Sequence, residues 1–526
     1  MCVARSSILP LFAFLGIPHP SHSHVSEKVE FLLWFRNHSH WVRPVQKGVH
    51  GRPVQVDVRR GGRKGTTVAT TRLQSKMVNP IPAALVWFVS LALASTASAT
   101  ALVEHRRKKR KHQWKVGPLH LEIGTQDGSE KEDKHVKTGL QVLEEKRWKP
   151  LMGKRVGWIT NHTGVFADLK HGVDVAQASG RVNIVAVFGP EHGFRGAAQA
   201  GAAEGFLRDT RTGIPVYDIY QKSGKLLRDL FLQTDVQVLV IDLQDVGSRF
   251  YTYIWTMYDC LVAAAGMERS PTVMVLDRPN PINGDAVQGP LLMSQHATFV
   301  GRKPISLRHG MTIGELARLF NGEFVPEEAG RGALLDVVQM KGWERSMEFE
   351  ATGLPWVPPS PNIPTVDSAR AYAGFCLLEG TNCSEGRGTT LPFQMVGAPW
   401  IDGGLTVALR GEISREVLRS VRFRESYFVP TFSKCAGSLC CGVQVFLEEK
   451  SDPLRVALAT IIAMKEMYPA HFQWQHTEDS YWFDCLTGSS RVREAIDSGA
   501  SVDELVALWQ DDLVWFNAMR TKYLLY

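Results

Sequence analysis

The stretch from Val185 to Gly196 carries a carboxylate, an imidazole and a guanidinium within five positions. It reads Val-Ala-Val-Phe-Gly-Pro-Glu-His-Gly-Phe-Arg-Gly, so Glu191, His192 and Arg195 follow a short apolar run and a Gly-Pro turn. In an α/β fold this order places reactive side chains at the carboxyl end of a buried strand. The three groups could supply an acid or base, a proton-exchanging neighbour and an anion clamp. Taken alone, the pattern also fits a solvated loop whose charges have no function.

Three further apolar runs end in polar clusters in the same way. Near-continuous Val, Ile and Leu runs are typical of parallel strands covered on both faces, and the stretch between them from Tyr253 to Ala265 predicts a helix. This alternation predicts a doubly wound parallel sheet, whose strand ends would bring all four clusters into one crevice. Such convergence favours an active site over four idle loops. The runs are Lys154–Thr160 before Asn161, Val236–Ile241 before Asp242, Asp245 and Arg249, and Thr272–Leu276 before Asp277, Arg278 and Asn280.

A second polar constellation lies in the stretch from Leu377 to Thr390. Its glycines let a loop approach a ligand closely, and its polar members are Glu379, Asn382, Glu385 and Arg387. The spacing of the glycines matches neither a phosphate-binding loop ending in Gly-Lys-Ser/Thr nor a dinucleotide-binding fingerprint. Nucleotide cofactors therefore have little support.

Most of the positive charge of the chain lies in its N-terminal part. The net charge is +7, but residues 1–111 hold 18 Lys and Arg against 4 Asp and Glu, which leaves −7 for the rest. The basic balance is thus no argument for nucleic-acid binding by the folded part, and no nucleic-acid-binding motif is present.

An uncharged run from Ile81 to Ala94 precedes Ala97-Ser98-Ala99, which is typical of a signal peptide with an Ala-x-Ala cleavage site. The run is short for a membrane span. We expect a signal peptide over 77–99 that starts at Met77, and hence a secreted or lysosomal protein with no stable membrane span after cleavage. Residues 1–76 would then be a spurious or disordered leader; the alternative is a genuine long N-terminal region with a signal anchor.

The remaining chain is long enough for two domains. Residues 100–136 are basic and polar and predict a linker. Five prolines between Leu354 and Pro364 indicate a break, so we expect one domain over 137–360 and a smaller α+β domain over 361–526. Helix-like patches cover 502–509 and 513–520. The cysteines show no zinc spacing; one or two disulfides are expected among Cys435, Cys440, Cys441 and Cys485, and Cys260 is expected to be a buried thiol.

These motifs together resemble the DUF1343 family of NamZ-type exo-β-N-acetylmuramidases. The resemblance covers residues 137 to 526 in order, and its most specific segments are 157–164, 188–196, 245–253, 277–281, 308–316, 379–390, 397–400 and 522–526. It implies a Rossmann-like domain that carries the active-site cleft, a smaller C-terminal domain, and release of N-acetylmuramic acid from the non-reducing end of peptidoglycan fragments. The long leader and the extra cysteines depart from the bacterial pattern.

The residues are compatible with that chemistry. Glycoside hydrolysis uses a carboxylic acid that protonates the leaving oxygen and usually a second group that activates water or attacks the sugar as a nucleophile. We assign Glu191 as the acid/base, His192 as the partner that adjusts its protonation, and Asp245 as the second carboxylate, with Asp277 and Glu385 in reserve. Arg249, Arg195 or Arg387 could clamp the lactyl carboxylate of muramic acid, with Arg249 ranked first. No metal or other cofactor is expected. Further substrate contacts are expected from Asn161, Tyr251, Tyr253, Asp277, Arg278, Asn280, Glu379, Asn382 and Glu385.

Tyr251 and Tyr253 could stack on a sugar ring, whereas Trp255 is expected in the core. Three other functions compete with the muramidase. A catalytically silent sugar-binding protein would keep the cleft without turnover, a broader β-N-acetylhexosaminidase would not select muramic acid, and a Rossmann-type oxidoreductase or transferase would need the dinucleotide fingerprint that the sequence lacks.

Overall fold

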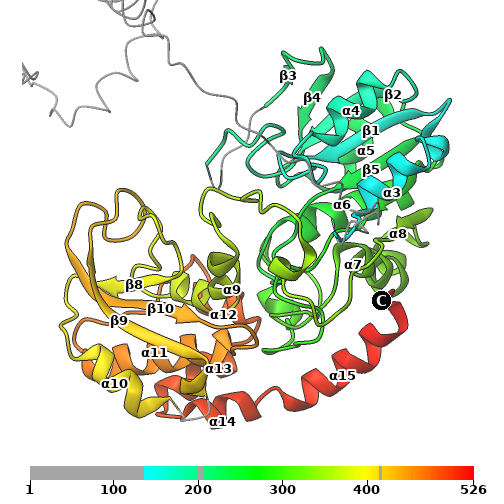
Figure 1. The fold of residues 1–526 in the computed structure, drawn as a ribbon. Helices are drawn as coiled ribbons and strands as arrows, with labels where there is room; N and C mark the ends of the chain where they lie inside the picture. The colour runs from blue at the N-terminus through cyan, green and yellow to red at the C-terminus, as the bar shows by residue number, and fades with distance from the viewer. Residues whose placement is uncertain (1–134, 200, 202–204, 414–416) are drawn as a thin grey trace, which may run out of the picture. The chain divides into compact units, whose positions relative to one another are not determined.

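The computed structural model describes residues 135–199, 201, 205–413 and 417–526. The predictions of a leader, of a signal peptide over 77–99 and of a linker over 100–136 fall almost wholly outside the described residues. Within the described ranges, no helix has the length and apolar character needed to cross a membrane. Figure 1 shows the arrangement of the labelled helices and strands.

A seven-stranded sheet forms the first half of the described chain. Its order is β3-β4-β2-β1-β5-β6-β7, and every neighbouring pair is parallel except β3 and β4. From central β1 the chain builds outward through β2 to β4, and then in the other direction through β5, β6 and β7. This is the predicted doubly wound, Rossmann-like order, with its switch point between β1 and β5. The strands are β1 Arg155–Thr160, β2 Asn183–Gly189, β3 Leu207–Arg208, β4 Pro215–Asp218, β5 Val238–Asp242, β6 Thr272–Leu276 and β7 Leu335–Val338.

Helices cover both faces of this sheet because both faces of its central strands are apolar. Trp158 and Val240 pack on one face with the residues of α3 and α4, whereas Ile159 and Ile241 pack on the other face with those of α5 and α6. The predicted helix from Tyr253 to Ala265 is confirmed as α6 with the same bounds. The helices of this half are α3 Gly139–Glu145, α4 Gly172–Ala178, α5 Gly224–Gln233, α6 Tyr253–Ala265, α7 Ile313–Leu319 and α8 Val325–Ala329.

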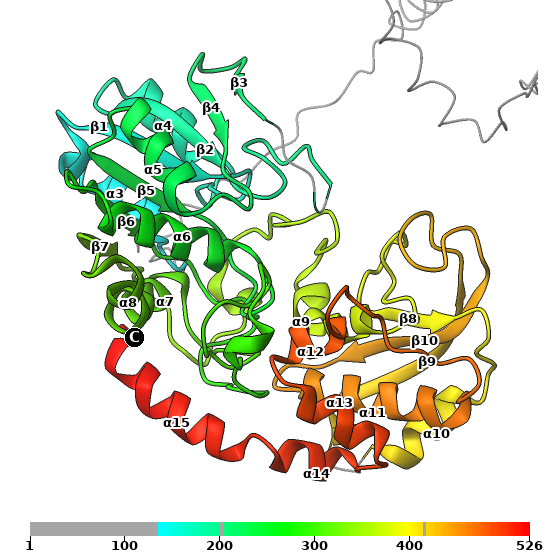
Figure 2. The ribbon, with the colours of Figure 1, turned by 180° about the vertical axis from the view of Figure 1, so that it is seen from behind.

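The second half of the chain has a smaller antiparallel sheet of order β8-β10-β9 with helices packed on it, visible from behind in Figure 2. This agrees with the α+β character predicted for the second domain. The proline-rich stretch from 354 to 364 holds neither helix nor strand. The elements are β8 Met395–Ala398, β9 Val421–Phe428, β10 Cys440–Leu447, α9 Val366–Phe375, α10 Leu405–Glu412, α11 Pro453–Met467, α12 Trp482–Thr487, α13 Ser490–Asp497, α14 Val502–Ala507 and α15 Gln510–Arg520.

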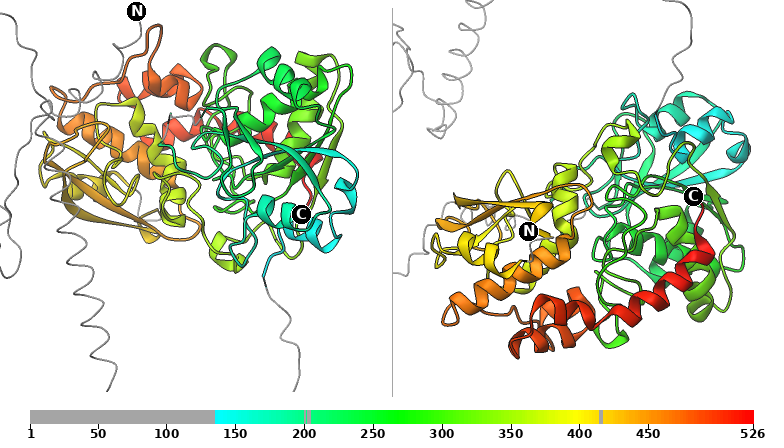
Figure 3. Two further views of the ribbon diagram at one scale, coloured as in Figure 1. Left: turned by 90° about the horizontal axis from the view of Figure 1, so that it is seen from above. Right: turned by 60° about the horizontal axis from the view of Figure 1, so that its bottom comes forward.

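The last helix returns the chain to the first sheet. Figures 1 and 3 show α15 running back toward α7 and α8, with the C-terminus beside them. The Tyr526 hydroxyl donates a hydrogen bond to Asp277 (2.8 Å), and the Leu525 amide donates one to Glu315 (2.8 Å). The two sheets are thus joined at the chain terminus as well as by the covalent connection after β7.

The disulfide prediction is corrected by the structure. All four cysteines named for it are free, as is Cys260, which is buried as expected. Cys440 and Cys441 are neighbours on β10, so their side chains point to opposite faces of the sheet, and Cys485 lies on α12. Sequence proximity therefore did not imply a bridged pair.

Candidate active site

The four predicted clusters do converge at the carboxyl edge of the first sheet. Asn161 follows β1, Glu191 follows β2, Asp245 follows β5 and Asp277 follows β6. A fifth strand, β4, adds Tyr220 at the same edge. The strand ends on either side of a topological switch point form the usual ligand crevice of such a sheet.

Glu191 is held from two sides in this crevice. Its Oε2 accepts a hydrogen bond from the Thr252 hydroxyl (2.7 Å), and its Oε1 accepts one from the Gly201 amide (2.8 Å). The carboxylate is only half-buried, so it remains open to a ligand. Tyr220 lies beside it: burial and the Glu191 charge raise the pKa of the Tyr220 phenol to about 12. Glu191 therefore has a fixed orientation and a donor-rich surrounding.

His192 supports the loop that carries Glu191. Its Nδ1 lies 3.0 Å from the Ala198 carbonyl oxygen, and its backbone has a φ of 72°, which is uncommon for a residue other than glycine. Burial lowers the pKa of His192, while the neighbouring Glu191 carboxylate opposes that shift. At neutral pH the imidazole is thus neutral.

Asp245 and two tyrosines lie behind Glu191. Burial first, and then the charges of Glu191 and Asp245, raise the pKa of Tyr253, so this phenol lies close to both carboxylates. Asp245 accepts a hydrogen bond from the Gly247 amide (2.8 Å) and lies 3.4 Å from His309 Nε2. Its Oδ1 is buried without a hydrogen-bond partner among the described residues. Asp245 is thus near Glu191 but shielded from the crevice.

The expected stacking role of Tyr251 and Tyr253 does not fit their burial. Tyr253 is fully buried; its hydroxyl donates to the Pro359 carbonyl and accepts from Asn161 Nδ2, both at 2.6 Å. Tyr251 packs on Tyr253 with ring centroids 4.8 Å apart. Asn161 is fully buried as well, so it orients Tyr253 rather than a ligand. Trp255 is in the core, as predicted.

Asp277, Arg278 and Asn280 hold the strand ends together rather than a substrate. Burial raises the pKa of Asp277 to about 7, and its oxygens accept hydrogen bonds from Thr312, Gly314 and Tyr526. Arg278 forms a buried ion pair with Asp242 (2.6 Å). The Asn280 amide donates to the Met311 carbonyl (3.0 Å). Their position at the sheet edge was predicted; their assignment as substrate contacts is not supported.

All three arginines proposed as lactyl clamps already have partners in the protein. Arg249 is fully buried and donates to the carbonyls of Pro290, Ile305 and Leu486, at 2.7–3.0 Å. Arg195 pairs with Asp174 (2.9 Å) and Asp209 (2.8 Å). The sequence shows that these arginines lie on crevice loops but cannot show that other parts of the protein already occupy their donors.

The second constellation forms a charged cluster on the other half of the chain. Arg387 pairs with Glu379 (2.6 Å) and lies 3.4 Å from Glu385, which is buried and pairs with Lys434 (3.0 Å). The charge of Arg387 contributes to the lowered pKa of His192. Asn382 instead bonds the backbone of His471 and Gln473. Arg387, like Arg195, is thus already paired with carboxylates.

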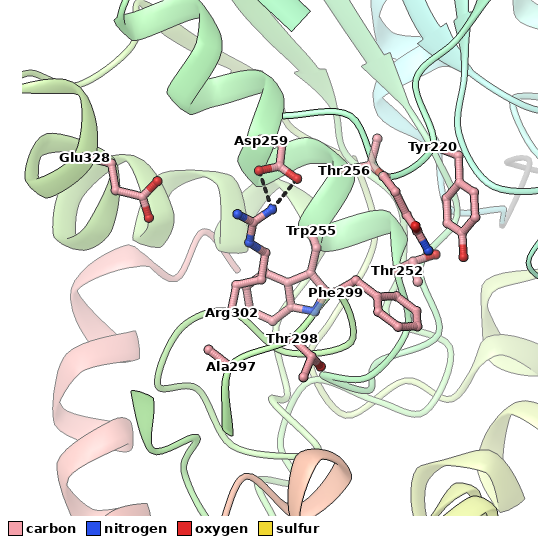
Figure 4. A pocket seen from close by; sticks show the side chains of 11 residues that line it. Tyr220, Thr252, Trp255, Thr256, Asp259, Ala297, Thr298, Phe299, Arg302 and Glu328 are labelled. Carbon is pink, nitrogen blue, oxygen red and sulfur yellow. Dashed lines mark hydrogen bonds and ion pairs between the residues drawn. The ribbon is translucent and has the colours of Figure 1, made fainter. Parts of the chain in front are cut away.

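A pocket of about 540 Å³ opens beside Glu191. Tyr220 and Thr252, the neighbours of Glu191, line one part of it, and α6 continues the wall through Thr256 and Asp259 (Figure 4). Phe299 and Arg302 close the other side. Sequence reasoning missed Tyr220 and Arg302. Tyr220 follows the apolar strand β4 and could have been found as a fifth strand end, whereas Arg302 lies on a loop without any periodic signal. Among the residues that the structure describes, no cluster of three or more His, Cys, Asp or Glu could hold a metal ion.

The sheet thus has the order of a Rossmann-like α/β fold, and its carboxyl edge presents a hydrogen-bonded carboxylate near a polar pocket. Residues 156–367 match the N-terminal domain of the exo-β-N-acetylmuramidase NamZ, and residues 370–526 match its C-terminal domain. The chain therefore belongs to the NamZ family, and it is a glycosidase.

Individual relatives agree with this assignment. The peptidoglycan β-N-acetylmuramidase NamZ of Bacillus subtilis (strain 168) is 44% identical over 393 residues, which are 74% of this chain and 91% of that protein. Two crystal structures of DUF1343 family proteins from Bacteroides fragilis NCTC 9343 superpose on 74% of this chain and 99% of their own, with TM-scores of 0.66 and 0.57 at 36% and 31% identity.

Proposed function

We propose that this protein hydrolyses the glycosidic bond of N-acetylmuramic acid at the non-reducing end of peptidoglycan fragments. The observation that carries the proposal is Glu191, a half-buried carboxylate fixed by Thr252 and Gly201, with Thr252 lining a neighbouring pocket of about 540 Å³. The name of the B. subtilis relative and the match over both family domains support the substrate class.

In this proposal Glu191 is the general acid that protonates the leaving oxygen. The neutral His192 beside it exchanges protons with it, and Thr252 and Gly201 fix the orientation of its carboxylate. Asp245 is too shielded to contact the sugar directly, so we assign it a positioning role: its charge acts on Tyr253, which packs behind Glu191.

Product analysis tests the substrate class. The purified protein is incubated with a disaccharide of N-acetylmuramic acid β-1,4-linked to N-acetylglucosamine, and with the reverse disaccharide. Release of both monosaccharides from the first alone supports the proposal. Cleavage of both would indicate a broader β-N-acetylhexosaminidase, and binding without cleavage would indicate a silent sugar-binding protein.

We further propose that the protein acts in a secreted or lysosomal setting. The support is the apolar run from Ile81 to Ala94 with the Ala-x-Ala site that follows. Peptide mapping of the protein recovered from its native source tests this: a mature chain that begins at Thr100 is expected, whereas peptides from residues 1–99 in the mature protein would contradict it.

A further inference from the structure

Arg302 lines the pocket, and only some of its N–H donors have hydrogen-bond partners in the described part of the chain. Its Nη1 contacts both oxygens of Asp259 at 2.5 Å, as Figure 4 shows. Its Nη2 and Nε have no hydrogen-bond partner among the residues that the structure describes, and the side chain is 32% exposed. A guanidinium carries five N–H donors in a planar fork that matches a carboxylate. Arg302 can therefore accept an anion without giving up Asp259.

The other charges around Arg302 select the kind of anion. Asp259 lies against it, and Glu328, which also lines the pocket, pairs with Lys303 (2.9 Å). Burial raises the pKa of Asp259 to about 6. With two carboxyl groups in the same wall, a dianionic phosphate would be repelled. A single carboxylate fits the remaining donors.

The distance along α6 suits a sugar with an acidic substituent. Thr252, which bonds Glu191, and Asp259, which holds Arg302, line the same wall. Seven residues of helix separate them by roughly 10 Å at 1.5 Å per residue. A pyranose whose glycosidic oxygen lies at Glu191 can extend its substituent toward Arg302. Phe299, which lines the pocket and is 45% exposed, offers an apolar surface for the ring.

We propose that Arg302 binds the lactyl carboxylate of the muramyl residue, and so selects N-acetylmuramic acid over N-acetylglucosamine. The inference rests on the proposed function and adds the residue that sets its specificity. It replaces Arg249, whose donors are all directed into the protein interior.

Binding of the two free monosaccharides to the unmodified protein and its variants, measured by ligand-observed NMR titration, tests this. The unmodified protein should bind N-acetylmuramic acid about 10- to 100-fold more tightly, the range expected for one charge-assisted bidentate pair. Arg302→Met should bring the two affinities within a few-fold of each other by weakening muramic acid binding alone. Lys303→Met removes the same charge one residue away and should keep the preference.

The design separates failure of this inference from failure of the proposed function. Because Arg302→Met leaves Asp259 without its partner, the double variant Arg302→Met/Asp259→Asn is measured as well, with thermal unfolding as a check of folding. A preference that survives in both variants, an equal loss of affinity for both sugars, or no preference in the unmodified protein overturns the role of Arg302. If the unmodified protein cleaves no muraminide at all, that result contradicts the proposed muramidase function rather than the role of Arg302.

Discussion

Glu191 and Thr252 form the contact on which the proposed chemistry depends most closely. A hydroxyl that donates to a carboxylate fixes the position of that carboxylate oxygen. The Thr252 hydroxyl lies 2.7 Å from Glu191 Oε2. Because Thr252 is the N-cap residue of α6, the start of the helix fixes the position of this donor. A general acid must be held within reach of the oxygen that it protonates, so Thr252 positions Glu191 for the proposed step.

Thr252→Val keeps the shape of this side chain but removes the donor. We expect kcat/KM for the muramyl disaccharide to fall by about tenfold, since a hydrogen bond to a charged group contributes roughly 1.5 kcal/mol or more and 1.36 kcal/mol corresponds to a tenfold change in rate. Thr256→Val, one turn further along α6, removes a hydroxyl that has no hydrogen bond to Glu191 among the described residues and should lower kcat/KM far less. An unchanged kcat/KM in Thr252→Val would argue against the role of Thr252 in positioning Glu191.

At the scale of the element, α7 depends on a capping box shared with the strand end of β6. The Thr312 hydroxyl accepts from the Glu315 amide (3.2 Å) and donates to Asp277 (2.8 Å), and the Glu315 carboxylate accepts from the Thr312 amide. The same box occurs at the exposed start of α14, between Ser501 and Glu504. The two boxes differ in burial, which allows a matched comparison.

Thr312→Ala should lower the free energy of unfolding by about 2 kcal/mol, because it removes the cap and one partner of a buried carboxyl group. Ser501→Ala should cost about 0.5–1 kcal/mol, because water can replace its contacts. Denaturant unfolding of both variants measures the difference. Equal losses would mean that the Asp277 contact contributes nothing.

The N-terminus of α4 provides a pH-dependent cap. His171 Nδ1 accepts a hydrogen bond from the Val173 amide (3.2 Å), which a protonated ring cannot do. Burial lowers the pKa of His171 below its usual 6.5. The unfolded chain therefore binds more protons than the folded protein between the lowered pKa and about 6.5, and stability falls as the pH drops through that window.

His171→Asn keeps an acceptor at the cap that does not titrate, so its stability should fall less steeply below pH 6.5 than that of the unmodified protein. Other titrating groups, such as Asp277, are the same in both proteins and cancel in the difference. Thermal unfolding between pH 5 and 7 measures this. Parallel curves for the two proteins would show that His171 does not contribute.

The elements were the part of this protein most accessible from the sequence. Long apolar runs such as Val238–Asp242 and the helix Tyr253–Ala265 follow from periodicity, and the doubly wound class of the sheet follows from their alternation. The meeting of Glu191 and Asp245 at one edge follows as well. The antiparallel pair of β3 and β4 was not predicted. What could not be predicted is which polar side chains already have partners inside the protein. Arg249, Asp277 and Arg278 have the right types and positions, but their hydrogen-bond and ion-pair partners come from segments distant in sequence.

At the scale of the whole molecule, one hydrophobic cluster includes residues of both halves of the described chain, and polar contacts between distant segments add to it. Arg249 reaches from the edge of the first sheet to Leu486 on α12, and Tyr526 reaches from the C-terminus to Asp277. Burial lowers the pKa of Arg249 to about 9, yet three carbonyl groups depend on its donors. This arginine is a structural connection rather than a substrate contact.

Arg249→Lys should therefore behave as a stability variant. The shorter ammonium group cannot reach three divergent carbonyls, and each buried acceptor left unpaired costs about 1–3 kcal/mol. We expect a clear loss in thermal unfolding temperature, whereas KM for the surviving folded enzyme stays near its original value. A normal unfolding temperature combined with a raised KM for muramides would instead restore the clamp role.

The most direct test of the account concerns the leaving group. Glu191→Gln is compared with the unmodified enzyme on the muramyl disaccharide and on an aryl muraminide whose phenolate leaves without protonation. We predict that kcat/KM for the disaccharide falls by at least ~100-fold, the range for loss of a general acid, and that the aryl substrate loses far less. Unchanged turnover of the disaccharide, in a variant whose unfolding temperature is normal, would contradict the assignment of Glu191 as the acid.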